Sequence, residues 1–201
     1  MMKFIPFIDK TKAVDFTAAT TLARRLNDDF KVNPAPPQYS VKSLIAALSA
    51  ALDEENVVVI GVTNKYYLKL KKALSIVLKG EFYDNEAIKK MVLEQDKDAH
   101  ELYYQFMNGN VVFRSEDGFY CGYAVSTSPH KIIVLPLGDE KYAPMLEKVK
   151  EYVLDTGEEY NEAEVLKASE QESKKWARVF AICSLLSVIG ALGVALFEVL
   201  R

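Results

Sequence analysis

Three carboxylates in this sequence stand where strands of an α/β sheet are expected to end. Asp9 follows the apolar run 3–8, and Asp139 and Glu140 follow the apolar run 131–136. Open α/β sheets bind ligands at the carboxyl ends of their strands, and carboxylates there supply the anionic ligands that metal-assisted chemistry needs. We therefore include all three among the candidate ligand-binding residues, and the alternative is that they are solvent-facing loop acids.

The stretch VVVIGVTNKYY, residues 57–67, leads from a buried strand into a helix at the same kind of position. Gly61 would let a ligand approach the backbone, and Thr63 and Asn64 offer polar contacts. Asn64 is equally suited to cap the helix that follows. Tyr66 is a further candidate, because its ring and that of the next tyrosine could stack on a planar ligand. A tyrosine pair at a helix start more often packs against the sheet.

The other reactive side chains are isolated in the sequence. His100 and His130 have no partner at catalytic spacing, so we expect surface roles for both. Cys121 lies in an alternating run beside a glycine, which favours a small buried hydrophobe over a nucleophile. No serine-histidine-aspartate order, phosphate-binding glycine loop or metal-ligand spacing occurs. We predict no catalytic residue and no metal site.

The apolar periodicity predicts alternating strands and helices that would position these residues. Strands are expected at 3–8, 56–62, 110–114, 119–125 and 131–136. Helices are expected at 16–30, 41–52, 68–77, 85–95 and 142–153, the first, second and fourth capped by Asp15, Ser40 and Asp84. NPAPPQ, residues 33–38, is expected to be a rigid turn. The pattern predicts an α/β fold with three α/β/α layers, a mostly parallel sheet and a late hairpin.

Composition limits the partners and the compartment. The chain has 201 residues, half of them hydrophobic, and a formal net charge of −3. Charges of both signs are interspersed without a basic block, so we expect no nucleic-acid partner. Two cysteines without metal or disulfide spacing favour a reducing compartment. One globular domain of residues 1–154, with additional segments, fits this length.

The carboxyl-terminal part predicts attachment to a lipid bilayer. Residues 179–197 contain no charge, and as a helix they would span about 28 Å, close to the thickness of the hydrocarbon core. Lys174, Lys175 and Arg178 precede this run, which places the amino-terminal domain in the cytoplasm. We expect a charged stalk at 155–175 and a transmembrane helix at 176–200 in a single-pass protein of the cell membrane.

Several stretches resemble the molybdopterin-binding domain family, which includes molybdopterin adenylyltransferases and competence/damage-inducible proteins. HKIIVLPLGDEKYAPMLEKVKEYV, residues 130–153, resembles the closing strand and helix of that family, with its Pro-Met pair at Pro144 and Met145. VVFRSEDGFYCGY is similar to a family stretch with two glycines, matched by Gly118 and Gly122, and Ser115 lies near a usual asparagine. The resemblance adds Ser115 and Gly118 to the candidate ligand-binding residues.

The departures from the family pattern fall on its chemistry. The family loop after the strand at 56–62 resembles GGxGPTxDD, whereas this chain retains only Gly61 and Asn64 there. Tyr66 and Tyr67 stand near the positions of the family aspartates. Lys141 also occupies the place of a family glutamate. Too few of the anionic ligands that metal-assisted adenylyl transfer or pyrophosphate hydrolysis needs therefore remain.

The resemblance and these departures imply a binding or scaffold module that is catalytically degenerate, and the carboxyl-terminal run predicts that it is anchored in the membrane. One alternative is a divergent enzyme of the adenylyltransferase or pyrophosphatase type at the inner membrane face. Another is an anchored sensor of a small ligand. The resemblance implies a pterin or a nucleotide as the ligand, while the residues themselves predict no cofactor. Beside the lipid bilayer, the candidate partners are a second copy of the chain and another membrane protein.

Overall fold

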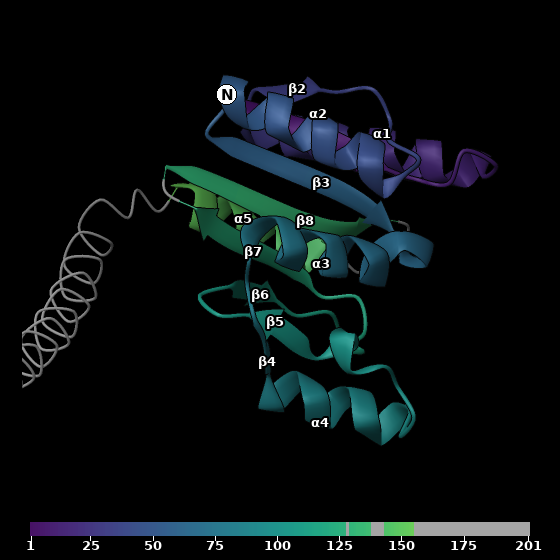
Figure 1. The fold of residues 1–201 in the computed structure, drawn as a ribbon. Helices are drawn as coiled ribbons and strands as arrows, with labels where there is room; N and C mark the ends of the chain where they lie inside the picture. Colours follow the sequence, from purple (N-terminus) through teal and green to yellow (C-terminus); the bar gives the residue numbers. More distant parts are fainter. Residues whose placement is uncertain (128, 138–142, 155–201) are drawn as a thin grey trace, which may run out of the picture. The chain divides into compact units, whose positions relative to one another are not determined.

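A six-stranded sheet forms the centre of the fold in a computed structural model that describes residues 1–127, 129–137 and 143–154 (Figure 1). The strand order is β2-β1-β3-β8-β7-β6. Strands β2, β1, β3 and β8 are parallel neighbours, and β7 and β6 complete the sheet antiparallel. The strands are β1 (Met2–Phe7), β2 (Val32–Pro34), β3 (Val57–Thr63), β6 (Val111–Phe113), β7 (Gly122–Thr127) and β8 (His130–Leu137).

Helices cover both faces of this sheet. One hydrophobic core joins the sheet to α1 (Ala13–Asp29) and α5 (Ala143–Leu154). The other core joins the opposite face to α2 (Val41–Glu54), α3 (Asn64–Leu78) and α4 (Glu86–Gln95). The predicted α/β class, the mostly parallel sheet and the late hairpin of β7 and β8 are confirmed.

Strand β3 shows why its sequence is a continuous apolar run. Val58, Ile60 and Val62 contribute to the core under α2 and α3, while Val59 contributes to the core under α1 and α5. A strand between two parallel neighbours with helices on both faces has no solvent-facing side, so β-branched residues are favoured at successive positions.

A second, two-stranded sheet was not predicted. It pairs β4 (Phe82–Asp84) antiparallel with β5 (Gln105–Met107), and a short 3₁₀ helix, η1 (Glu101–Tyr103), precedes β5. Three-residue strands are too short to show a period of two in the sequence. Phe106 and Met107 are nevertheless buried in the core under α3 and α4.

Two predicted helix caps are wrong. Helix α1 begins earlier, after Lys12, and Asp15 lies inside its first turn. Helix α4 is capped by Asn85, whose side chain accepts a hydrogen bond from the Ile88 amide at 3.2 Å, while Asp84 belongs to β4. For α4 two adjacent short polar residues, Asp84 and Asn85, both suit the N-cap. For α1 the N-cap is Lys12, whose side chain forms no cap bond and gives no cap signal in the sequence.

The turn predicted at 33–38 is partly a strand. Val32–Pro34 pairs with the start of β1, and Gln38 forms an isolated bridge with Phe7. Prolines are tolerated here because β2 is an edge strand, which needs backbone donors on one side only.

The predicted cap of α2 is confirmed, and its contribution to the free energy of unfolding can be tested. Ser40 accepts a hydrogen bond from the Ser43 amide at 3.1 Å, and the Ser43 side chain completes a capping box. We expect Ser40→Ala to lower the free energy of unfolding by about 1 kcal/mol in urea denaturation, because the first turn of α2 loses its acceptor. Ser40→Asp keeps an acceptor and should lie near the unsubstituted protein. Equal losses for both substitutions would contradict the capping role.

The described residues of the two cores all belong to one unit, Met1–Leu154. The predicted stalk at 155–175 and the predicted transmembrane helix at 176–200 lie outside the described residues. Within the part of the chain that the structure describes, no helix is long and apolar enough to cross a bilayer.

Candidate functional site

The candidate site lies where the strand order changes direction. The chain leaves β1, crosses through α1 to β2 on one side, and returns through α2 to β3 on the other side of β1. Open α/β sheets bind ligands at such a switch point, in the crevice outside the carboxyl ends of the two strands. In this chain Asp9 follows β1 and Lys65 follows β3, so both stand at the switch point.

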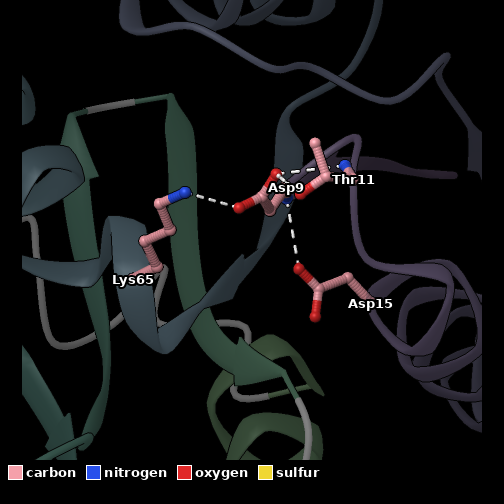
Figure 2. Close-up of polar contacts among 4 residues, drawn as sticks. All are labelled: Asp9, Thr11, Asp15 and Lys65. Atoms are coloured by element: carbon pink, nitrogen blue, oxygen red, sulfur yellow. Dashed lines mark hydrogen bonds and ion pairs between the residues drawn. The ribbon is translucent and has the colours of Figure 1, made fainter.

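Asp9 and Lys65 form an ion pair across this position (Figure 2). Lys65 Nζ donates to Asp9 Oδ2 at 2.5 Å. The other oxygen, Oδ1, accepts from the amide and the hydroxyl of Thr11 at 3.1 and 2.8 Å. The Asp9 amide in turn donates to Asp15 Oδ2 at 3.2 Å. Asp9 is 4% exposed, and both of its oxygens are therefore occupied by groups of the chain itself.

These contacts fix the charges of the pair. The hydrogen bond from Lys65, followed by those from Thr11, holds the pKa of the Asp9 carboxyl well below its usual range. The same hydrogen bond, with the nearby negative charge, raises the pKa of Lys65. Asp9 is consequently ionised and paired, rather than poised to accept a proton from a substrate.

The ion pair predicts how the Asp9 pKa responds to loss of Lys65. Replacing Lys65 with methionine should raise the Asp9 pKa by at least about one unit, because the nearest positive charge and one hydrogen bond are removed. A carbon-detected NMR titration of the Asp9 carboxyl group measures this change directly. Lys69→Met is the matched control, since the Lys69 ammonium lies over the Tyr66 ring instead. An unchanged Asp9 titration in Lys65→Met would show that the ion pair does not form.

The first turn of α3 offers hydrogen-bond donors beside the pair. Thr63 occupies the N-cap position but forms no side-chain cap bond. Its hydroxyl is buried and has no hydrogen-bond partner among the residues that the structure describes. Asn64, predicted as a possible cap, is instead the first residue of the helix and is exposed. Uncapped amides at a helix start, together with a lysine, suit an anionic group.

Gly61 lies within β3 and not in the loop after it. A Cβ atom at this position would stand 2.8 Å from a ring carbon of Phe4 and 3.1 Å from a methyl carbon of Leu137. The glycine therefore makes room for close packing between β3 and its neighbours under α1 and α5. This is a structural requirement in the core, separate from the ion pair at the strand ends.

The two tyrosines of the loop contact the domain itself. The ring of Tyr66 stacks on Phe7, with centroids 4.9 Å apart and an interplanar angle of 21°. Tyr67 is 1% exposed, and its hydroxyl donates to the Cys121 carbonyl at 2.6 Å. Both rings thus pack the start of α3 against the sheet, and Tyr66 is only partly exposed to solvent.

Ser115 and Gly118 lie in the turn between β6 and β7. The Ser115 hydroxyl donates to Asp117 Oδ1 at 3.0 Å, and the backbone at Gly118 has a φ of +79°. A Cβ atom at Gly118 would stand 3.2 Å from Met91 on α4. These residues organise the turn and its packing on α4, and these contacts do not extend to Asp9 or Lys65.

The other residues singled out from the sequence do not lie with Asp9 and Lys65 in the described structure. Asp139 and Glu140 lie outside the described residues. Cys121 is buried, and burial raises the pKa of its thiol, which donates to the Gly118 carbonyl at 3.3 Å. His100 Nδ1 accepts from the Leu102 amide at 3.1 Å. Among the residues that the structure describes, no group of three or more histidine, cysteine, aspartate or glutamate side chains could hold a metal ion.

Sequence reasoning missed Lys71, the only lysine that is completely buried in the described part of the chain. Its Nζ donates to the Leu102 carbonyl at 2.6 Å and lies 3.5 Å from the centroid of the Phe106 ring. The rings of Tyr67 and Tyr123 lie 5.6 Å from the same nitrogen. Desolvation lowers the pKa of Lys71 to about 7. The sequence did contain one signal that Lys71 is buried: it lies four residues after Tyr67, on the same face of α3.

A hollow of about 270 Å³ lies elsewhere, between α1 and the β1–β2 edge of the sheet. Its lining is apolar except for Thr20, whose hydroxyl donates to the Phe16 carbonyl at 2.9 Å. Small side chains on α1 and the shortness of β2 leave this space open. Its lining residues include no group that could carry out acid, base or nucleophilic chemistry.

Comparisons with known proteins bear on the fold alone. The structure is similar to the crystal structure of the protein CinA from Thermoplasma acidophilum, which is described as having unknown function. The similarity has a TM-score of 0.60 at 9% sequence identity, and it covers 76% of this chain and 99% of that chain. No protein-family model matches the chain, and no curated protein matches it. The likeness supports a molybdopterin-binding-like fold for the described unit.

Proposed function

We propose that this chain is a membrane-anchored cytoplasmic binding module with a molybdopterin-binding-like fold and no catalytic activity. The observation that carries the proposal is the state of Asp9. It is the carboxylate that the described strand ends bring to the switch point, and both of its oxygens are occupied by Lys65 and Thr11. A carboxylate in this state is unsuited to binding a metal ion or accepting a proton.

The proposed ligand group is an anion held at the first turn of α3. The helix start carries a partial positive charge and free amides. Lys65 has a side chain that is 56% exposed, so it can approach a ligand while it stays near Asp9. The unpartnered hydroxyl of Thr63 adds a buried donor at the same helix end. These features support binding through a phosphate or carboxylate, as in a nucleotide or a phosphorylated pterin.

The membrane part of the proposal rests on the sequence. Residues 179–197 are uncharged and long enough to span a bilayer, and the basic residues before them favour a cytoplasmic domain. Resistance of the full chain to extraction from membranes at alkaline pH, and its loss on removal of residues 176–201, would support the anchor. Extraction of the full chain as a peripheral protein would contradict it.

The ligand part is tested by thermal denaturation with a panel of ATP, AMP, pyrophosphate and a pterin, each with and without Mg²⁺. We expect at least one anionic compound to raise the melting temperature without a requirement for Mg²⁺, and we expect no turnover of any of them. Thr63→Val should reduce the shift, whereas Thr17→Val, which alters an exposed hydroxyl on α1, should not. Mg²⁺-dependent turnover would favour the divergent-enzyme alternative and contradict the proposal.

A scaffold role for the same module predicts a protein partner at the membrane. Crosslinking in intact membranes should capture either a second copy of the chain or another membrane protein, and the product should disappear when residues 176–201 are removed. Recovery of the uncrosslinked chain alone, under several crosslinking chemistries, would exclude the scaffold role and leave the sensor of a small ligand.

A further inference from the structure

Exposed lysines and apolar side chains gather at the carboxyl end of the sheet, on the half formed by β1, β2 and β3. Helix α1 follows β1, and α3 follows β3 directly, so both begin at this end (Figure 1). Helix α2 begins there too, because Gln38, just before it, pairs with Phe7 at the end of β1. We call this surface the basic rim, and its exposed lysines and large apolar residues are Lys10, Lys12, Val14, Phe16, Tyr39, Lys42, Lys65 and Lys69.

The charge of the basic rim is opposite to that of the chain. The segments 9–16, 39–43 and 63–69 contain five lysines and two aspartates, which gives a net charge of +3, against −3 for the whole sequence. Of the two aspartates, Asp9 is buried against Lys65. The segments that follow β6 and β8, residues 114–121 and 138–142, each have a net charge of −1 in the sequence. The positive charge is therefore specific to the half of the sheet formed by β1, β2 and β3.

The lysines of the rim are available to a partner. Lys10, Lys12 and Lys42 are exposed and form no ion pair with another residue that the structure describes. They belong to the start of α1 and the start of α2, on either side of the β1–β2 edge. Three unpaired positive charges on adjoining helix ends form a surface that attracts anions over several ångströms.

Apolar side chains stand among these charges. Val14 is 67% exposed, Tyr39 is 42% exposed and Phe16 is 37% exposed. The rings of Phe16 and Tyr39 are 6.4 Å apart, and Phe16 also lines the 270 Å³ hollow beneath α1. Aromatic rings surrounded by lysines are characteristic of surfaces that enter the headgroup region of a bilayer, where rings and positive charges are both stabilised.

We propose that the basic rim binds the anionic surface of a lipid bilayer. Lysines 10, 12 and 42 would contact lipid headgroups while Phe16 and Tyr39 enter the interface. This inference rests on the membrane attachment proposed above and adds an orientation to it, with the carboxyl end of the sheet facing the lipid. The switch point between β1 and β3, with Asp9 and Lys65, would then face the membrane.

The length of the chain beyond the domain permits this orientation. Helix α5 ends at the opposite end of the sheet, where the Tyr152 carbonyl accepts from Lys131 and its hydroxyl bonds to Ser126. The sequence provides 24 residues, 155–178, before the uncharged run begins. They reach at most about 80 Å when extended. A domain of this size has a radius of gyration of about 15 Å, so the connection is long enough to pass around it.

Sedimentation with vesicles tests the inference on residues 1–154. This unit contains both of its cores, and its fold matches nearly the whole of the crystallised CinA chain, so it can be tested without the anchor. We expect it to bind phosphatidylcholine vesicles that contain 30% phosphatidylserine, and to bind pure phosphatidylcholine vesicles far more weakly. Binding should decrease as salt is raised, because the lysine contacts are screened. Equal binding to both vesicle types, or to neither, would overturn the inference.

Two sets of substitutions locate the surface. Changing Lys10, Lys12 and Lys42 to glutamate should lower the partition coefficient at least about 100-fold. The control changes Lys31, Lys97 and Lys148 to glutamate, which alters the net charge equally at exposed positions away from the rim. Equal losses in both variants would overturn the inference. Phe16→Ser with Tyr39→Ser should weaken binding that remains at high salt.

Two further outcomes distinguish lipid binding by the rim from an acidic protein partner and from the anchor. A unit that binds soluble polyglutamate through the same three lysines but does not bind vesicles would have an acidic polypeptide as its partner, which overturns the inference. If the full chain stays in membranes at alkaline pH but residues 1–154 do not bind anionic vesicles, the proposed anchor is supported and lipid binding by the basic rim is overturned. If residues 1–154 bind vesicles but the full chain is extracted at alkaline pH, lipid binding by the basic rim is supported and the proposed anchor is contradicted.

Discussion

Replacing Lys71 with methionine is expected to raise the free energy of unfolding at pH 7 by about 2–3 kcal/mol. The lysine is fully buried, and desolvation lowers its pKa from 10.5 to about 7. Each unit of this shift corresponds to about 1.4 kcal/mol against the folded state. Methionine keeps the aliphatic stem but leaves the Leu102 carbonyl without its donor, which offsets about 1–3 kcal/mol of the gain.

The same substitution should remove a pH dependence. Between pH 7 and 10.5 the unfolded chain carries a proton on Lys71 that the folded chain has lost, so stability rises with pH in this window. It should therefore increase by up to about 3 kcal/mol from pH 7 to pH 9.5. Burial raises the pKa values of Tyr67 and Tyr123, which makes stability fall again above pH 10. Burial also raises the pKa of the Cys121 thiol, which opposes the rise in stability above about pH 8.5. That contribution is common to Lys71→Met and the unsubstituted protein, so the difference between their urea denaturation profiles from pH 6.5 to 9.5 isolates the lysine.

Lys72→Met is the matched control for this experiment. Lys72 is the next residue of α3 and is exposed, so methionine there removes one lysine without changing the buried cluster. We expect the control to keep the pH dependence of the unsubstituted protein. Parallel profiles for Lys71→Met and the unsubstituted protein would show that Lys71 is solvated in solution, and that the aromatic residues around it do not form a closed core.

The layers of the fold could be predicted because both cores repeat simple patterns. The residues of β3 are apolar at successive positions, and Leu44 and Leu48 on α2 recur at the helical period, so each element can be recognised from its own residues. The β4–β5 sheet could not be predicted in this way. Its pairing joins Phe82 to Met107, 25 residues away, and three-residue strands carry no period of their own.

The candidate site was predicted less completely than the fold. Asp9 was recognised from its place after a strand, but its partner Lys65 was not, because an ion pair between two strand ends leaves no spacing signal. Thr63 was recognised as polar, whereas its lack of a partner is visible only in three dimensions. Lys71 was hidden by its charge, since lysine on a helix is usually exposed and here lies among aromatic rings.

The role of Gly61 shows how packing can imitate a functional signal. Glycine after a buried strand is what a ligand loop requires, and the sequence resemblance places it beside such a loop. The structure instead puts Gly61 under the Phe4 ring, within β3. Its backbone is not among the described residues with positive φ, so the absence of a side chain, and not the backbone conformation, is what the position needs.

Gly61→Ala should therefore lower the free energy of unfolding by about 2–3 kcal/mol, without any ligand present. The new methyl group would stand 2.8 and 2.9 Å from two ring carbons of Phe4, closer than packed carbons allow. Phe4→Leu removes part of that ring, so adding it to Gly61→Ala should cost at least about 1 kcal/mol less than adding it to the unsubstituted protein, as a double-mutant cycle in urea can measure. If Gly61 served a ligand instead, alanine would leave the stability unchanged and weaken binding alone. The cycle thus separates a glycine needed for core packing from one needed for ligand binding.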